Sequence, residues 1–203
     1  MATGVATDTT LEAIVLAAGF GARFGGGKLT ARWRDGVLLD GALAAAFAAP
    51  VRTVTVVWGA DAAVPEAAKA FAERASETPR LKLVNAERHA EGLSASLKSG
   101  IASLSPDRTG AFVFLGDMPR IPYSVLGPLA EAVGAGAPAA ATVFEGTRGH
   151  PVLFGRDLLP GLLELDGDRG AGGLLAGLGD RLALIPSPDD GVLYDVDRPA
   201  DLA

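Results

Sequence analysis

Short apolar runs alternate with longer amphipathic segments through the first two thirds of the chain. The runs rich in Val, Ile, Leu and Phe predict strands at residues 12–17, 53–58, 81–85 and 111–115. The Ala- and Leu-rich segments predict helices at residues 39–49, 61–75, 94–104 and 122–133. Alternating strands and helices need crossover connections, so we expect parallel strands that are buried on both faces.

The pattern changes after residue 135. Strands are predicted at 139–144 and 151–154, joined by a short polar turn, and again at 181–186 and 192–196. Helical segments are predicted at 155–165 and 170–178. We expect antiparallel pairing in this half, and therefore one α/β domain with a mostly parallel mixed sheet. That domain spans 12–203, after a Thr-rich, flexible terminus at 1–11 without an export signal.

Composition excludes several classes of function. The 203 residues contain 24 Asp and Glu against 18 Lys and Arg, which argues against a nucleic-acid-binding surface. The absence of cysteine excludes disulfides, thiolate metal sites and cysteine nucleophiles. The longest apolar stretches are too short to span a bilayer. We expect a cytoplasmic protein without nucleic-acid or membrane partners.

The first strand leads directly into a glycine-rich loop. Five glycines lie within residues 19–27, and the loop carries Arg23 and ends at Lys28. Glycines let backbone N–H groups approach an anion closely, so the loop is suited to phosphate. It is not a Walker loop, because Ala22 and Leu29 replace the required residues, and Phe24 breaks the dinucleotide fingerprint. A flexible turn without a ligand is the alternative.

The other predicted parallel strands also end in residues suited to binding. Ligands of open α/β sheets bind at the carboxyl ends of the strands. Asn85 ends the third strand, Gly92 and Ser94 open the next helix, and Asp117 ends the fourth strand. Asp is a common helix cap, but a carboxylate opposite a phosphate loop is typical of a Mg²⁺ ligand. We therefore expect one crevice that binds phosphate and metal.

Six motifs occur in order along the chain. They are the loop from Leu16 to Lys28, the segment from Asn85 to Ser96, Gly116-Asp117-Met118-Pro119, Arg148-Gly149-His150-Pro151, Gly167-Asp168-Arg169-Gly170-Ala171, and the segment from Asp195 to Leu202. Together they resemble the nucleotidyltransferases related to molybdenum cofactor cytidylyltransferase and the MobA-like NTP transferases. The resemblance covers the chain from Glu12 onward and implies a Rossmann-like, GT-A-type three-layer sandwich.

The resemblance also implies an activity. Such an enzyme binds an NTP and Mg²⁺, transfers the nucleoside monophosphate to a phosphorylated small-molecule acceptor such as molybdopterin, and releases pyrophosphate. Contact with the enzyme that receives the cofactor is implied as well. GTP-using relatives carry a second glycine at the position of Ala18 and an Asp-Lys pair where this chain has Gly27-Lys28, which favours CTP.

The resemblance implies roles for individual residues. Arg23 and Lys28 would be the catalytic cations, and Asp117 and Asp168 would hold the metal. The nucleotide-binding residues would be Leu16, Ala17, Ala18, Gly19, Gly21, Arg23, Lys28, Asn85, Gly92, Ser94 and Ser96. The chemistry agrees, since a guanidinium can bind two phosphate oxygens and an ammonium supplies a compact charge. In-line attack on the α-phosphorus depends on positioning and charge neutralisation, so it needs no protein nucleophile.

The second metal ligand has competing assignments. Asp168 precedes a predicted helix and could be its N-cap. Asp195 and Asp197 would share one face of an extended strand and form a competing metal-binding pair. Together with Asp201 they could instead cap a terminal helix that begins near Arg198.

The two histidines receive different interpretations. The resemblance places Arg148 and His150 on the acceptor side, where either could touch the acceptor phosphate, although a lone histidine is more often a packed residue. His89 lies in a polar loop and is expected to be solvated. Two other functions remain as alternatives: a nicotinamide-dependent oxidoreductase, suggested by Gly19 and Gly21, and a nucleotide-binding module without turnover.

Overall fold

A computed structural model describes residues 10–19, 21, 24–167 and 170–202. Within these residues, seven strands form one sheet in the order β5-β4-β1-β6-β8-β7-β9. Their bounds are β1 Leu11–Ala17, β4 Val54–Trp58, β5 Leu81–Asn85, β6 Gly110–Leu115, β7 Ala139–Phe144, β8 Thr147–Gly155 and β9 Leu182–Pro186. The first four pair in parallel, β8 is antiparallel to β6 and β7, and β9 is parallel to β7. The mostly parallel mixed sheet is confirmed.

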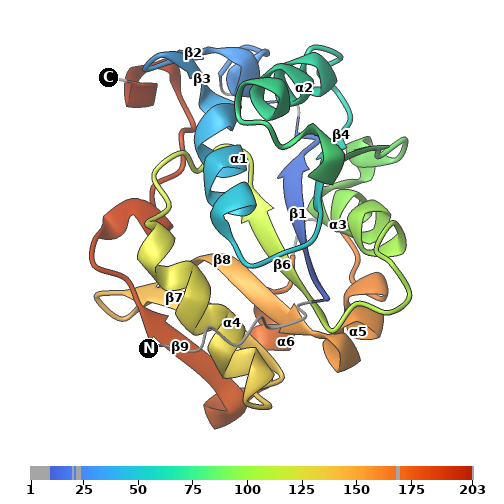
Figure 1. Ribbon diagram of the computed structural model, residues 1–203, viewed down its shortest axis with the longest axis vertical. Coiled ribbons are helices and arrows are strands. Elements are labelled where there is room, and N and C mark those ends of the chain that lie inside the picture. Colours follow the sequence, from blue (N-terminus) through green and yellow to red (C-terminus); the bar gives the residue numbers. More distant parts are fainter. Residues whose placement is uncertain (1–9, 20, 22–23, 168–169, 203) are drawn as a thin grey trace.

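Helices cover both faces of the sheet, which gives three layers (Figure 1). One face packs against α1 Leu38–Ala48, α2 Val64–Arg74 and α4 Leu126–Gly134, and the other against α3 Leu93–Ala102, α5 Leu159–Leu163 and α6 Gly172–Ala176. Strand β1 supplies both cores, because successive side chains point to opposite faces. Ala13 and Val15 pack on the first face, and Ile14 and Leu16 on the second.

The topology places the switch point of the sheet beside β1. The chain moves from β1 to β4 and β5 on one side and returns to β6 on the other. Leu16 is in register with Val57 of β4 and with Leu115 of β6. The two directions of winding diverge at this point, and ligands of open α/β sheets bind there, outside the carboxyl ends of the strands.

Three predicted segments differ in the second half. The turn expected before residue 151 is mostly strand, because β8 begins at Thr147 and includes Arg148 and His150. The strand predicted at 192–196 is wrong: a 3-10 helix covers Asp190–Val192, and no strand follows it among the described residues. The helix expected at 155–165 is shorter, because Gly155 still belongs to β8 and a 3-10 helix covers Arg156–Leu158 before α5. The helix expected at 170–178 is reduced to α6, since Gly170 has a positive φ of 52° that a helix does not adopt.

Near the amino terminus, β1 begins at Leu11, inside the segment expected to be flexible. A small antiparallel pair, β2 Arg32–Trp33 and β3 Gly36–Val37, was not predicted, since two-residue strands leave no periodic pattern. The C-terminal segment runs from β9 past α1 towards this pair (Figure 1). Here Trp33 contacts Tyr194, with ring centroids 6.3 Å apart.

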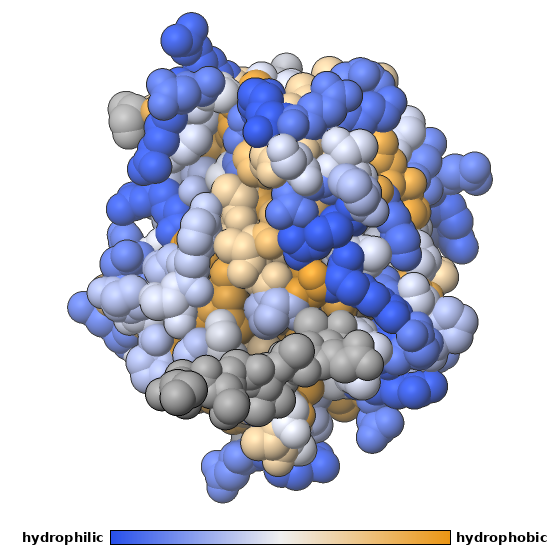
Figure 2. All heavy atoms as spheres, viewed as in Figure 1, coloured by the Kyte–Doolittle hydropathy of each residue, from blue (hydrophilic) through white to orange (hydrophobic). Residues whose placement is uncertain are grey.

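The surface is largely polar on the face covered by α1 and α4. Apolar side chains show there as a band between hydrophilic residues (Figure 2). Among the described residues, no helix is long and apolar enough to cross a membrane.

Candidate active site

A cavity of about 420 Å³ opens at the carboxyl ends of β1 and β6. It is lined by Leu16, Ala18, Gly19, His89, Gly92, Leu93, Ser96, Leu115 and Asp117. Three segments that are distant in sequence meet here: the end of β1, the start of α3 and the end of β6. Six of these residues were predicted to bind nucleotide or metal, and the structure brings those six together.

The glycine-rich loop turns back on itself beside this cavity. The carbonyl of Gly21 accepts hydrogen bonds from the N–H groups of Phe24, Gly25 and Gly26, at 2.9, 3.2 and 3.3 Å. Gly21 has a φ of 61°, and a Cβ there would lie only 3.0 Å from the Cβ of Lys28. The glycine therefore allows the turn and the close approach of Lys28. In this structure these three amides are used within the loop.

Lys28 and Asp117 form an ion pair at the centre of the site. The Nζ atom of Lys28 lies 2.6 Å from Oδ2 of Asp117 and 3.9 Å from Oδ1 of Asp197. The side chains of Lys28 and Asp117 are 13% and 24% exposed. The end of the glycine-rich loop and the predicted metal carboxylate are thus in direct contact, across the junction of β1 and β6.

Backbone contacts hold Asp117 in place. The N–H of Gly116 donates to the carbonyl of Leu16 at 2.9 Å, and the N–H of Val196 donates to the carbonyl of Asp117 at 3.1 Å. Glycines permit the packing on either side. A Cβ on Gly41 would overlap the carbonyl of Pro119, and one on Gly191 would overlap that of Arg120. These positions were not predicted, because a lone glycine inside a helix or a turn does not reveal what packs against it.

The C-terminal segment brings further carboxylates to the same place. Burial raises the pKa of Asp195, and the negative charges of Asp117 and Asp197 raise it further, while Lys28 opposes them. Carboxylate oxygens are the ligands that hard divalent cations prefer, so this donor set fits Mg²⁺ or Mn²⁺. Nevertheless, no three His, Cys, Asp or Glu side chains of the described chain are grouped closely enough to form a complete metal centre.

Asp201 has the capping role that was the alternative for this segment. Its Oδ2 accepts hydrogen bonds from the N–H groups of Asp197 and Arg198, at 3.0 and 2.7 Å, and a 3-10 helix covers Pro199–Leu202. Asp195 and Asp197 do not lie on a strand, so the argument from a shared strand face was wrong. They reach the site because Val196 between them is hydrogen-bonded to Asp117.

The remaining predicted nucleotide-binding residues do not all face the first cavity. Asn85 and Ser94 line a neighbouring depression of about 440 Å³. Ser94 is buried, and its N–H donates to the carbonyl of Gly167 at 3.2 Å. The side chain of Ala17 packs in the core beneath α1. Arg23 and Asp168 lie outside the described residues.

Arg148 and His150 line a third cavity, of about 280 Å³ and mostly apolar. It shares Leu16, Leu93 and Leu115 with the first, so the two adjoin. Burial lowers the pKa of His150, which keeps its imidazole neutral at pH 7. Its Nδ1 atom is buried and has no hydrogen-bond partner among the described residues.

His89 is less exposed than expected. Its ring is half-buried and packs against Gly59, where a Cβ would lie 2.6 Å from its Cγ atom. The residue also lines the first cavity. The polar sequence around it concealed this position, since the contact depends on a glycine at the end of the neighbouring strand β4.

Comparisons with known proteins agree with the fold and with the family that the motifs resemble. A family model of the MobA-like NTP transferase domain matches residues 13–182. Rv0371c from Mycobacterium tuberculosis H37Rv is 26% identical, with a TM-score of 0.79 and 95% of each chain covered. Its homologue from Mycobacterium sp. strain JC1 is 28% identical, with a TM-score of 0.75, covering 95% of this chain and 92% of that one.

A third structure, of Rv0371c from Mycobacterium tuberculosis H37Rv in complex with manganese, is 24% identical, with a TM-score of 0.66 and 88% of each chain covered. A comparison with curated proteins finds no match.

Proposed function

This chain belongs to the MobA-like NTP transferase family, and we propose that it is a Mg²⁺-dependent cytidylyltransferase. It would transfer CMP from CTP to a phosphorylated small molecule such as molybdopterin and release pyrophosphate. The observation that carries the proposal is the contact between Lys28, at the end of the glycine-rich loop, and Asp117, at the end of β6. A cation and a carboxylate meet where an NTP and its metal would have to meet.

The chemistry requires little from the protein beyond charge and position. An oxygen of the acceptor phosphate attacks the α-phosphorus of the NTP, and the bond to the β-phosphate breaks as pyrophosphate leaves. Lys28 would bind the phosphate oxygens on which negative charge accumulates, with Arg23 as a second cation. Glycines of the loop would let the phosphates approach the backbone.

The metal would be held by Asp117 together with a second carboxylate. Asp197 is favoured by its position, because its Oδ1 lies 3.9 Å from the same ammonium that contacts Asp117. Asp168 remains the candidate implied by the family resemblance. When bound, a divalent cation would neutralise phosphate oxygens and orient them for displacement. The manganese complex of Rv0371c supports a hard divalent metal in this family.

The two adjoining cavities suggest where the substrates lie. The nucleoside would occupy the cavity lined by Gly19, Gly92 and Ser96. The acceptor would extend into the apolar cavity lined by Arg148 and His150. An apolar wall suits a planar ring better than a polyol, because buried hydroxyl groups without partners cost free energy. This supports a molybdopterin-like acceptor, with Arg148 near its phosphate.

The test measures pyrophosphate release by the purified protein. CTP, GTP, ATP and UTP are each supplied with Mg²⁺ or Mn²⁺ and with a panel of phosphorylated acceptors that includes molybdopterin. We expect metal-dependent release with CTP and a pterin phosphate. Release with GTP alone would correct the nucleotide, and release with a polyol phosphate would correct the acceptor.

Other outcomes would reject the activity. Tight NTP binding without pyrophosphate from any acceptor would favour a binding module. Enhanced NADH fluorescence on titration, without competition from CTP, would favour an oxidoreductase.

A further inference from the structure

The ammonium group of Lys28 occupies the position of a counter-ion within a group of carboxylates. It contacts Asp117 at 2.6 Å and lies 3.9 Å from Asp197. Two carboxylates and one lysine therefore share a partly buried region at the end of β6.

Such a group needs a cation to be stable. Like charges that are partly removed from water repel each other strongly, because the effective dielectric constant there is well below that of bulk water. Burial leaves only 13% of the Lys28 side chain exposed, so its positive charge acts mainly on these neighbours. Without Lys28, the carboxylates in this region would bind another cation more tightly.

The ammonium group of Lys28 is also able to move away from Asp117. A lysine ammonium is a point charge on a flexible stem, without the fixed bidentate geometry of arginine. Its backbone stays anchored, since its carbonyl accepts a hydrogen bond from the N–H of Ala31 at 3.2 Å. The preceding residues Gly25, Gly26 and Gly27 all have positive φ. Glycine adopts such backbone conformations readily, whereas residues with a Cβ atom rarely do.

Backbone N–H groups of the glycine-rich loop also have partners within the protein. Its amides at Phe24, Gly25 and Gly26 donate to the carbonyl of Gly21, while Lys28 is paired with Asp117. Cationic and amide groups suited to phosphate are thus engaged within the protein. A triphosphate would compete for these groups, and in doing so would release the carboxylate of Asp117.

We propose that Lys28 is the resident counter-cation of Asp117 and Asp197 and competes with the divalent metal for them. The free protein then binds metal weakly. Metal enters together with the NTP, whose phosphates draw Lys28 away from the carboxylates and supply the missing oxygen ligands. This inference rests on the proposed function for the identity of the anion, but the competition between Lys28 and metal is measurable without any nucleotide.

The first experiment measures Mn²⁺ binding to the nucleotide-free protein by electron paramagnetic resonance. We expect Lys28→Met to bind Mn²⁺ roughly tenfold more tightly than the wild type, the equivalent of one charge-assisted hydrogen bond. Lys28→Arg keeps the charge and is expected to bind as weakly as the wild type. Lys69→Met, which removes an exposed lysine from α2, is the matched control and should change nothing. Equal Mn²⁺ affinity in Lys28→Met and the wild type would overturn the proposal.

A second experiment needs no variant and so does not depend on the folding of Lys28→Met. Acetylation of individual lysines in the wild-type protein is followed by mass spectrometry as Mn²⁺ is added. We expect Lys28 to be protected at first and to react several-fold faster once Mn²⁺ occupies the site, while Lys69 reacts at a constant rate. Unchanged labelling of Lys28 at a Mn²⁺ concentration that saturates the site would contradict the competition.

The two proposals fail in distinguishable ways. If Lys28→Met binds Mn²⁺ more tightly but no NTP yields pyrophosphate, the competition stands and the proposed activity falls. If CTP is turned over but neither Mn²⁺ experiment shows an effect, the activity stands and Lys28 is only a phosphate ligand.

Discussion

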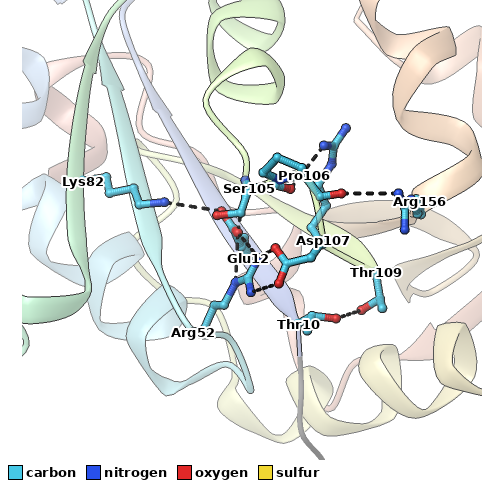
Figure 3. A network of polar contacts seen from close by, with 10 residues as sticks. Thr10, Glu12, Arg52, Lys82, Ser105, Pro106, Asp107, Thr109 and Arg156 are labelled. Atoms are coloured by element: carbon cyan, nitrogen blue, oxygen red, sulfur yellow. Dashed lines mark hydrogen bonds and ion pairs between the residues drawn. The ribbon is translucent and has the colours of Figure 1, made fainter.

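The two ends of β1 carry ion pairs of different construction. At the amino end, the fully buried Glu12 accepts hydrogen bonds at Oε1 from Nε and an Nη of Arg52, at 3.0 and 2.7 Å, and from the N–H of Ser105 at 3.2 Å (Figure 3). Arg52 also binds both carboxylate oxygens of Asp107, and Lys82 lies 3.8 Å from Glu12. At the carboxyl end, Lys28 contacts Asp117 through one hydrogen bond.

The difference in construction indicates that the ion pairs at the amino end stabilise the fold, whereas the ion pair at the carboxyl end serves the activity. Arg52 connects β1 to the segment before β6 through several bonds at once, so no single ligand could replace it. Lys28 has one close partner and a flexible stem, so a metal or a phosphate could replace either member of the pair. We therefore expect changes at the amino end to alter stability, and changes at the carboxyl end to alter activity.

The largest effect is expected at the carboxyl end, from Asp117→Asn. This change keeps the shape of the side chain but removes the charge that would hold the metal. Pyrophosphate release should fall about 100-fold or more, the range for losing a key electrostatic group. The midpoint of urea unfolding should change little. Asp107→Asn is the matched control at the amino end and should leave activity unaltered. Near-normal turnover by Asp117→Asn would remove this residue from the metal site.

An intermediate effect is expected at the amino end, from Arg52→Met. The substitution keeps most of the length of the side chain but leaves the buried carboxylate of Glu12 with a backbone N–H and a distant lysine. Removing one partner of a buried ion pair typically costs about 3 kcal/mol. Urea unfolding followed by circular dichroism measures this loss, and activity per folded molecule should be unchanged. Unaltered stability would show that Lys82 and Ser105 suffice for Glu12.

The smallest effect concerns acid stability. Hydrogen bonds from Arg52 lower the pKa of Asp107 from its usual 3.8 to about 2. A carboxylate whose pKa is lower in the folded state stabilises the fold above its unfolded pKa, and this contribution is lost as the pH falls through the folded value. The unfolding free energy of the wild type should therefore decline more steeply than that of Asp107→Asn between about pH 4 and pH 2. Urea titrations across this range compare the slopes. Parallel curves would mean that the exposed Asp107 adds nothing to the network around Glu12.

Much of the fold followed from local patterns. Strands buried on both faces leave continuous apolar runs, so the bounds of β1, β4, β5 and β6 were predicted to within one residue. The bounds of the helices between them were predicted to within three residues. The secondary structure was predicted wrongly in segments that lack a clear hydrophobic periodicity. The segment at 192–196 is apolar enough for a strand, but it docks against the loop after β6 and does not pair with the sheet. The pair β2 and β3 is too short to leave a pattern.

The candidate site was predicted in part. Gly19, Lys28 and Asp117 follow from a rule about where parallel strands end, and the structure does bring them to one place. Ser94 faces a neighbouring depression, because the start of α3 presents its successive residues in different directions. Asn85, at the end of β5, lines the same depression. His89 was missed, since its partial burial depends on Gly59, which follows strand β4.

The sequence by itself determined the order of strands and helices, the glycine-rich loop, and the presence of a lysine and an aspartate at the carboxyl ends of two strands. Each of these features depends only on residues close together in the sequence. Periodicity marks the strands and helices, glycine content gives the loop its backbone freedom, and the charged side chains are read directly. Only the tertiary structure decided that Lys28 pairs with Asp117 and that Asp197 comes beside them. An ion pair between distant residues depends on how layers pack, and here a hydrogen bond from Val196 to Asp117 and the close approach of Gly41 and Gly191 set that packing.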